Sequence, residues 1–446
     1  MATTRRFQAM LNEYLPNKLL REEMIKRDYI LKTVPKDDSW KSGNYIVPFK
    51  GAGASSIRMG GLTAANDISQ STYVRGQVPE YKEMWGSLIF NHRDLMEHGE
   101  KGMERSFINL LVEELPDFMD KMKMTASIQL GTGPHFATVT KTAGGQEENG
   151  EIRVDRVDRF DIGQKIQVHN ANTGTPVTHY ISKIDLNRSS LTLLNANKGA
   201  ISAKLTGAAL GSKIYTDGAQ GTGTRTQPGS GSSATFGAFG NAFTSLSQSL
   251  LAFSNTGAAK GSENLHGITK TDYPYLQCIN QNGSAFTKAN ILDGLLDFWV
   301  KMRNQGGGAG RDILVSYDVG AAILKAVENT NNSSYRGNYD MDKKGRTANV
   351  FGWDEIWIHT IKGSFKVVML QEWDTDKIVF WDPNTCTFAS NGMFQKRKSP
   401  DGTEFFEVRN TTGYQYICDV SLFGELIVKK PKGNGIIHSV DATKLA

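Results

Sequence analysis

A stretch from Tyr45 to Trp85 is predicted to form two extended strands with little core of their own. The first strand ends near Phe49 and contains Pro48, a residue confined to the edges of sheets. A segment rich in Gly, Ala and Ser follows at 51–61, and the chain then returns as a second strand. An isolated hairpin is only marginally stable in water. This arm is therefore predicted to lie against something else, most naturally a neighbouring subunit.

Aromatic and charged side chains on the arm are the candidates for contact with that neighbour. Aromatic residues anchor many protein interfaces. Because the arm has little core of its own, its aromatic side chains are predicted to be buried against a partner rather than in a private core. The candidate inter-subunit contacts on the arm are Tyr45, Phe49, Arg58, Tyr73, Arg75, Tyr81 and Trp85.

A helical pattern from about Met96 to Leu130 is the second strong constraint. Apolar residues recur at helical spacing from Met103 to Met122 and form a single stripe. About 30 helical residues would span roughly 45 Å, which is long for a compact domain. Pro116 is expected to kink this helix or to mark a junction between two helices.

Charged residues follow the first part of this helix and allow two interpretations. Glu97 and Lys101 attract each other one turn apart, whereas Glu100 and Glu104 repel. The charges can form a solvated face, or they can form lateral salt bridges between subunits. On the second interpretation the contact candidates are Glu97, Glu100, Lys101, Glu104 and Arg105.

The rest of the chain divides into a β-rich unit, a low-complexity connector and an α+β region. Short strands separated by turn residues between 152 and 218 predict a small barrel inserted into the main fold. A stretch rich in Gly, Ser and Thr from 218 to 240 is typical of a flexible connector. Helices and strands then alternate, and strands dominate from 356 onward.

No motif for catalysis or cofactor binding stands out. The dipeptide Gly-Lys of a P-loop never occurs. The glycine run at 306–310 follows a helix and precedes a strand, which is the reverse of the order that a phosphate cradle needs. The EF-hand-like start at Asp340 has Phe351 where the calcium loop requires a glutamate. We therefore expect a protein that is not an enzyme and that has no catalytic residue, metal or cofactor.

Composition limits the cellular compartment and the kinds of partner that the sequence allows. Cys278, Cys386 and Cys418 are too few and too scattered for a disulfide framework, which suits a reducing cytoplasmic origin. The formal net charge is +5, and no basic arm stands out. The closest run, Lys396 to Lys398, is interpreted as a solvated loop. Neither a secretory core nor a membrane-spanning run is visible.

The order of these parts resembles the tailed-bacteriophage major capsid proteins, which share the Hong Kong 97-type fold. A helical N-terminal arm, an extended two-stranded loop, a long helix and a late α+β region follow one another as in that family. The stretches that carry the likeness are 88–95 (LIFNHRDL), 154–163 (VDRVDRFDIG) with 214–218, 267–274 (GITKTDYP) and 416–431.

The resemblance implies an α+β Hong Kong 97-type capsid fold with an N-arm, E-loop, long spine helix, peripheral and axial domains, and a small β-barrel-like insertion domain. The expected boundaries are 1–44 for the N-terminal arm, 45–95 for the E-loop, 96–151 for the spine helix and the start of the peripheral domain, 152–218 for the insertion domain, 219–285 for the connector, 286–400 for the axial domain, and 401–446 for the closing strands and tail.

The function implied is that of a coat protein that self-assembles as hexamers and pentamers into the icosahedral head around packaged double-stranded DNA, without sequence-specific binding. The implied partners are further copies, a separate scaffolding protein, a portal and possible decoration proteins, and no membrane. Assembly is expected in the host bacterial cytoplasm. Gly60, Gly61 and Pro116 are hinge candidates for the movements of head maturation. The alternatives are another virion component, of tail or decoration type, and an enzyme with a glycine-rich loop.

Overall fold

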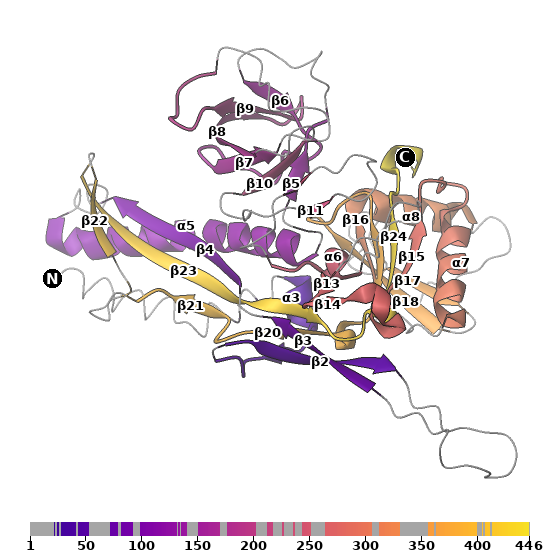
Figure 1. Ribbon diagram of the computed structural model, residues 1–446. Helices are drawn as coiled ribbons and strands as arrows, with labels where there is room; N and C mark the ends of the chain where they lie inside the picture. The colour runs from indigo at the N-terminus through magenta and orange to yellow at the C-terminus, as the bar shows by residue number, and fades with distance from the viewer. Residues whose placement is uncertain are drawn as a thin grey trace, which may run out of the picture.

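The computed structural model describes the chain in segments: residues 22, 25, 28–41, 43–52, 72–78, 82–91, 99–131, 133, 135–140, 150–169, 176–201, 212–216, 225–226, 235–236, 243–250, 264–305, 312–330, 356–360, 363–398, 404, 406–410 and 413–445. Side chains at 99–113 of the long helix are outside this description. The expected α+β class is confirmed, and a hairpin, a long helix, a barrel and a late mixed sheet follow in the expected order (Figure 1).

A central sheet is organised around one 16-residue strand, β23 (Gly413–Val428). The strand passes through Gly424, whose φ of +150° is readily adopted by glycine. β4 (Lys82–Asn91) pairs antiparallel with β23 along its whole length. The other strands of this sheet are β1 (Lys36–Asp37), β20 (Cys386–Ala389), β21 (Phe394–Lys396) and β22 (Phe406–Asn410).

The long helix α5 (Gly99–Gly131) lies on one face of this sheet (Figure 1). Its 33 residues correspond to roughly 50 Å. Met119 and Met122 are buried against Met84 and Leu88 of β4 in the same core cluster. The helix approaches β4 closely at Gly86, where an added Cβ would lie 2.5 Å from the sulfur of Met122. Pro116 lies inside one continuous helix, so the predicted junction between two helices is wrong.

The two-stranded arm consists of β2 (Tyr45–Ala52) and β3 (Thr72–Val78), paired antiparallel. The expected return of the arm through Trp85 is wrong, because those residues belong to β4 in the central sheet. The claim that the arm lacks a core is also wrong for its described part, since both strands bury one face against other segments of the same chain. The buried residues of this cluster are Trp40, Val47, Phe49, Val78, Leu265, Ile268, Leu276, Ala389 and Ile427.

The β-rich unit is a six-stranded antiparallel sheet in the order β5-β10-β7-β8-β9-β6. An isolated bridge between Val139 and Val154 joins its two edges and closes it as a small barrel. The unit starts at β5, before the expected boundary at 152. Its strands are β5 (His135–Thr138), β6 (Glu151–Arg153), β7 (Lys165–His169), β8 (Pro176–Asp185), β9 (Ser190–Leu194) and β10 (Lys213–Thr216).

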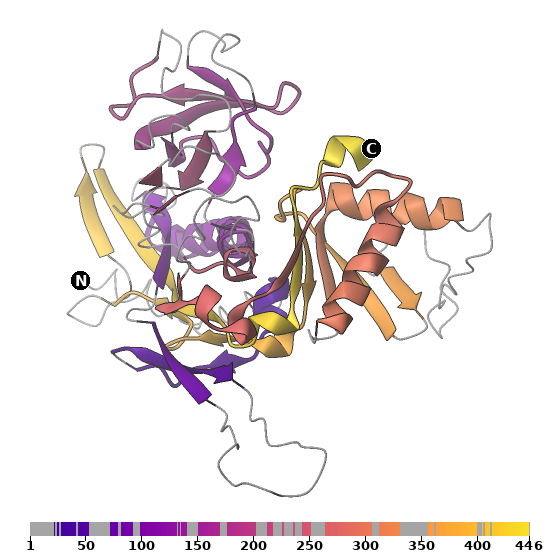
Figure 2. The same ribbon diagram turned by 45° about the vertical axis from the view of Figure 1, so that its right-hand side comes forward.

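The late α+β region is a mixed sheet in the order β15-β24-β19-β16-β18-β17, with α7 and α8 packed together on one face (Figure 2). The other face, through Leu314, Val379 and Ile436, joins the core of the central sheet. Strands outside the expected limits of 286–400 complete it. The elements are β15 (Ile279–Asn282), α7 (Ile291–Asn304), β16 (Asp312–Ser316), α8 (Tyr317–Thr330), β17 (Ile356–Thr360), β18 (Gly363–Leu370), β19 (Ile378–Trp381), β24 (Gly435–His438) and α9 (Ala442–Leu445).

Short elements connect these units. Asp28 caps α3 (Tyr29–Thr33), accepting from Leu31 N at 2.5 Å and from the Ser127 hydroxyl of α5. Burial raises the pKa of Asp28 to about 6.

The other short elements of the described chain are β11 (Arg225–Thr226), β12 (Thr235–Phe236), α6 (Leu246–Leu250), β13 (Asn264–Leu265), β14 (Ile268–Thr269), η3 (Lys270–Asp272), η4 (Pro274–Leu276), η5 (Pro383–Thr385) and η6 (Pro431–Gly433).

Candidate functional site

Two of the predicted contact residues on the arm are engaged within their own chain. Phe49 is 0% exposed and stacks on His266 with ring centroids 6.0 Å apart. The interface role of Phe49 is therefore wrong, because no part of its side chain is left for a neighbour. Tyr45 is half-buried, and its hydroxyl donates to Asp37 Oδ2 at 2.5 Å. Desolvation and this hydrogen bond raise the pKa of Tyr45 to about 12.

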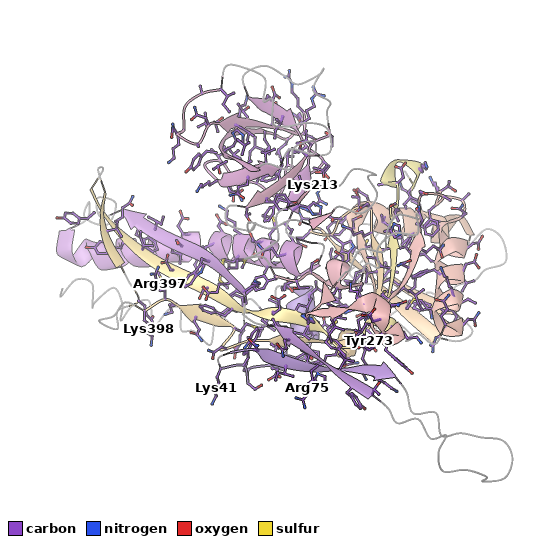
Figure 3. The ribbon with its side chains drawn as sticks, viewed as in Figure 1. Lys41, Arg75, Lys213, Tyr273, Arg397 and Lys398 are labelled. Atoms are coloured by element: carbon purple, nitrogen blue, oxygen red, sulfur yellow. The ribbon has the colours of Figure 1, made fainter. Side chains whose placement is uncertain are left out.

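The outer face of the arm carries the residues that remain open to a partner. Tyr73 on β3 is 67% exposed. Arg75 on the same strand is also exposed (Figure 3). Ile46 on β2, which the sequence analysis did not single out, is 55% exposed. Strand alternation explains the arrangement, because Val47 and Phe49 point inward while Ile46 points outward. We call Ile46, Tyr73 and Arg75 the arm face.

Trp85 lies on a different surface, the outer side of β4. Its ring meets Phe423 edge-on with centroids 5.7 Å apart, and its indole N–H donates to Glu83 Oε2 at 3.0 Å. The side chain is still 46% exposed, and Ile89 on the same side of β4 is 55% exposed. Trp85 is therefore accessible to a partner, but through the central sheet rather than through the arm.

The structure describes only some of the remaining residues that were predicted as contacts or hinges. Glu100, Lys101, Glu104 and Arg105 lie on α5, with their side chains outside the description. Pro116 is exposed on the same helix. The predictions for the remaining candidates lie outside the described residues; these are Arg58, Gly60, Gly61, Tyr81 and Glu97.

The run at 396–398 differs from the solvated loop that was expected. Lys396 lies on β21 with its side chain 1% exposed and forms an ion pair with Glu404 at 2.9 Å. The loop interpretation is wrong for this residue, since alternation along β21 turns it toward the core. Arg397 stays exposed, 3.5 Å from Asp419 and over the ring of Trp85.

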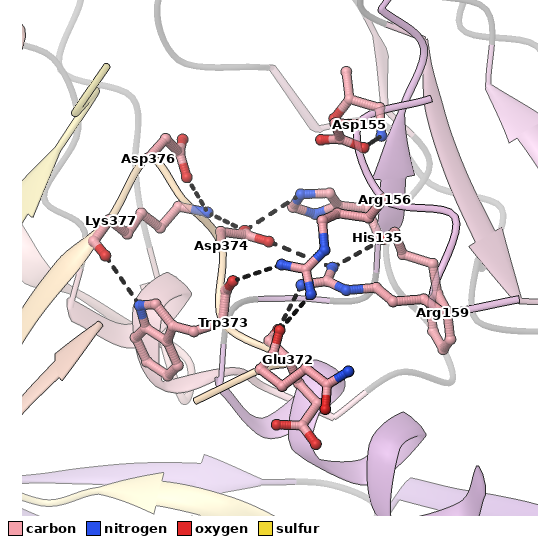
Figure 4. A network of polar contacts seen from close by, with 12 residues as sticks. His135, Asp155, Arg156, Arg159, Glu372, Trp373, Asp374, Asp376 and Lys377 are labelled. Atoms are coloured by element: carbon pink, nitrogen blue, oxygen red, sulfur yellow. Dashed lines mark hydrogen bonds and ion pairs between the residues drawn. The ribbon is translucent and has the colours of Figure 1, made fainter. Parts of the chain in front are cut away.

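A polar joint connects the barrel to the late α+β region, and the sequence analysis did not find it (Figure 4). Arg159, only 2% exposed, donates to Phe136 O at 2.8 Å within the barrel. The same guanidinium donates to Glu372 O at 2.6 Å and lies 3.6 Å from Asp374 Oδ1, beyond β18. Arg156 adds a contact of 3.4 Å to Trp373 O. Planar guanidinium groups suit this task because they offer several donors in a fixed geometry.

Asp374 is the central anion of this joint. Burial alone would raise the pKa of Asp374, but Lys377 at 2.8 Å and the nearby Arg159 outweigh burial and hold it well below its usual range. His135 lies 3.4 Å from Asp374, yet burial and the charge of Lys213 lower the pKa of His135 to about 3. His135 is therefore neutral, and the charged core of the joint is Asp374 with Lys377 and Arg159.

The described residues offer little for small-molecule chemistry. They contain no group of three or more His, Cys, Asp or Glu side chains placed to hold a metal ion. An open groove of about 550 Å³ lies between α5 and the barrel, bordered by Lys121, Ile162 and Leu186. No helix in the described segments combines the length and apolar character needed to cross a bilayer. These segments form an α+β fold with exposed apolar and charged side chains on its outer faces.

Comparison with known proteins gives similarity at the level of solved structures. No family model matches the chain, and no curated protein matches it. The chain is similar to the cyanophage A-1(L) capsid asymmetric unit, with 12% identity, a TM-score of 0.42, and coverage of 90% of this chain and 88% of that chain. It is also similar to the capsid of the native GTA particle, with 10% identity, a TM-score of 0.41, and coverage of 92% and 90%. A virus-like particle from Pyrococcus furiosus gives 8% identity, a TM-score of 0.33, and coverage of 94% and 96%.

Proposed function

We propose that this chain is the major capsid protein of a tailed bacteriophage, which builds an icosahedral head around double-stranded DNA. The observation that carries the proposal is the order and packing of three elements. A two-stranded arm with one open face precedes a 33-residue helix, and that helix lies on a sheet closed by a C-terminal strand. This is the order of parts that the sequence resemblance implies.

The distribution of exposed side chains supports assembly rather than catalysis. Tyr73 of the arm face and Trp85 of the central sheet are large aromatic side chains that remain accessible. Exposed apolar side chains on separate surfaces suit a subunit that touches several neighbours. Many modest contacts of this kind add up through multivalency in a closed shell.

The arm face is the proposed contact with the adjacent subunit, and α5 supplies lateral charges. Glu114 and Asp117 are exposed on α5 beside Pro116. Glu100, Lys101, Glu104 and Arg105 extend the charged stretch toward the start of the helix. Hexamers and pentamers, a separate scaffolding protein, a portal and decoration proteins complete the proposed assembly in the bacterial cytoplasm. Pro116 remains a proposed hinge for maturation.

Electron microscopy of the chain co-expressed with its scaffolding protein tests the proposal. We expect closed, uniform shells. A Tyr73→Asp variant should fold with an unchanged melting temperature but should build fewer shells, because a charge is placed on the arm face. Ser189→Asp, at an exposed turn of the barrel, is a control for added exposed charge. Tubes or small rings would favour a tail or decoration component, and a monodisperse small oligomer would contradict a capsid role.

A further inference from the structure

A group of lysines gathers beside the arm, although they come from two distant parts of the sequence. Lys429 and Lys430 follow β23, and Lys432 lies in η6. Lys50 comes from β2. Lys50 and Lys430 are exposed, and Lys429 and Lys432 are half-buried. We call Lys50, Lys429, Lys430 and Lys432 the lysine face.

Direct contacts hold part of this face together. The ammonium groups of Lys50 and Lys432 lie 5.0 and 5.2 Å from the centre of the Tyr275 ring. Tyr275 belongs to η4, which packs against both β2 and η6. The fold therefore brings two cations from opposite ends of the chain to one aromatic side chain.

The lysine face is only partly balanced by the described part of its own chain. None of its four members lies within 4 Å of a carboxylate among the described residues. The hydrogen bonds from Ser39 and Tyr45 and the charge of Lys429 lower the pKa of Asp37, so this carboxylate offsets one of the four positive charges. Like charges held together in this way repel one another, and a bound polyanion would relieve that repulsion.

The lysine face also has a defined place on the subunit. The arm and the barrel lie on opposite sides of the layer formed by α5 and the central sheet, in both ribbon views (Figures 1 and 2). Arg75 of β3 lies on the side of the arm away from the barrel (Figure 3). The subunit is therefore two-sided, and β2, which carries Lys50, lies on the side opposite the barrel.

Residue chemistry favours a nucleic-acid backbone over a second protein surface. Protein interfaces are depleted in Lys and enriched in Arg and aromatic residues, whereas all members of this face are Lys. Lysine acts as a mobile point charge that suits phosphate, and contacts to phosphate carry no sequence information. Tyr73 and Arg75 of the arm face fit a protein neighbour better, and because Tyr73 lies opposite Lys50 in the β2–β3 register, the lysine face borders that contact.

We propose that the lysine face binds the phosphodiester backbone of double-stranded DNA without regard to sequence. The inference rests on the proposed capsid function, and it assigns this side of the subunit to the interior of the head. Binding of this kind releases counterions from the duplex, so its affinity should fall steeply with salt.

Unassembled subunits and a fluorescent duplex of about 30 base pairs provide the test, read by anisotropy between about 50 and 200 mM salt. A Lys50→Gln, Lys430→Gln, Lys432→Gln triple variant should reduce the slope of log affinity against log salt by roughly 2.7, or about 0.9 for each lost contact. The corresponding Lys→Arg triple should keep the slope of the unaltered protein. Lys183, Lys288 and Lys325 are exposed elsewhere and, changed together to Gln, provide a control with the same net charge.

Each outcome decides the inference. A reduced slope of log affinity against log salt in the Lys50, Lys430 and Lys432 variant alone supports the inference. An equal reduction in the control variant would show an effect of net charge only and would overturn the inference. Binding of poly-glutamate in preference to duplex would assign the face to an acidic protein surface instead. Shell formation is scored separately by microscopy. Shells from a protein whose subunits do not bind duplex would refute this inference and leave the capsid function intact.

Discussion

The joint between the barrel and the late α+β region depends on the negative charge of Asp374, and an Asp374→Asn substitution removes that charge with little change in shape. Lys377 Nζ, 2.8 Å away, and the buried guanidinium of Arg159, 3.6 Å away, would then lose their shared carboxylate. The Asp374 side chain is only 11% exposed, so solvent would compensate little.

Removing one partner of a buried ion pair costs about 3–5 kcal/mol, because the remaining charge stays buried without compensation. Taking the lower figure and ~2–4 °C per kcal/mol for a large domain, the melting temperature should fall by roughly 6–12 °C. Asp376→Asn is the matched control. Asp376 lies 3.7 Å from the same lysine but is 55% exposed, so its loss should cost at most about 1 kcal/mol.

The pH dependence of the melting temperature distinguishes the contribution of Asp374 from that of other carboxylates. The pKa of Asp374 is held below its usual range, so its contribution is present above the unfolded pKa and is lost only as the pH falls through the lower folded value. The difference in melting temperature between Asp374→Asn and the unaltered protein should therefore be the same at about pH 5.5 and about pH 8. Differential scanning fluorimetry measures both. A shift no larger than that of Asp376→Asn would refute the assigned role of the joint.

Three further predictions concern the core. Burial raises the pKa of Glu425 to about 7 with Thr244 N as its partner, so stability should fall as pH rises from about 4.5 to 7, and Glu425→Gln should abolish this fall and melt higher at about pH 8. Gly86→Leu should cost about 1–3 kcal/mol by overpacking against α5; an unchanged thermal melt would contradict this close approach. Phe49→Ala should cost about 3–5 kcal/mol in denaturant unfolding, whereas Tyr73→Ala should leave unfolding unchanged and lower only shell yield; the reverse pattern would contradict the assignment of the two rings.

Local pattern was enough to predict several elements. The alternation at Tyr45 to Phe49, the apolar stripe of α5 and the short strands of the barrel each depend on neighbouring residues, and periodicity reports such preferences directly. The same local view led to the wrong account of the arm. Its core is completed by Leu265 and Ile427, whose proximity no local pattern reveals.

The contacts between units could not be predicted for the same reason. Arg156 and Arg159 lie in a segment that was noted only for its family likeness, while their acceptors lie more than 200 residues later. The lysine face has one local signal in the sequence, the run Lys429-Lys430-Pro431-Lys432. Its neighbour Lys50 is distant in sequence, so the cluster emerges only in three dimensions.

The pairing of β4 with β23 has a consequence for synthesis of the chain. About 320 residues separate the end of β4 from the start of its partner. At ~5–20 residues per second, the ribosome needs roughly 15 to 65 s to deliver that partner. Until then the apolar side of β4, with Met84, Leu88 and Phe90, lacks its hydrogen-bonding neighbour and is a site for misfolding or aggregation. Conditions that slow elongation should therefore increase the demand for chaperones during expression of this protein.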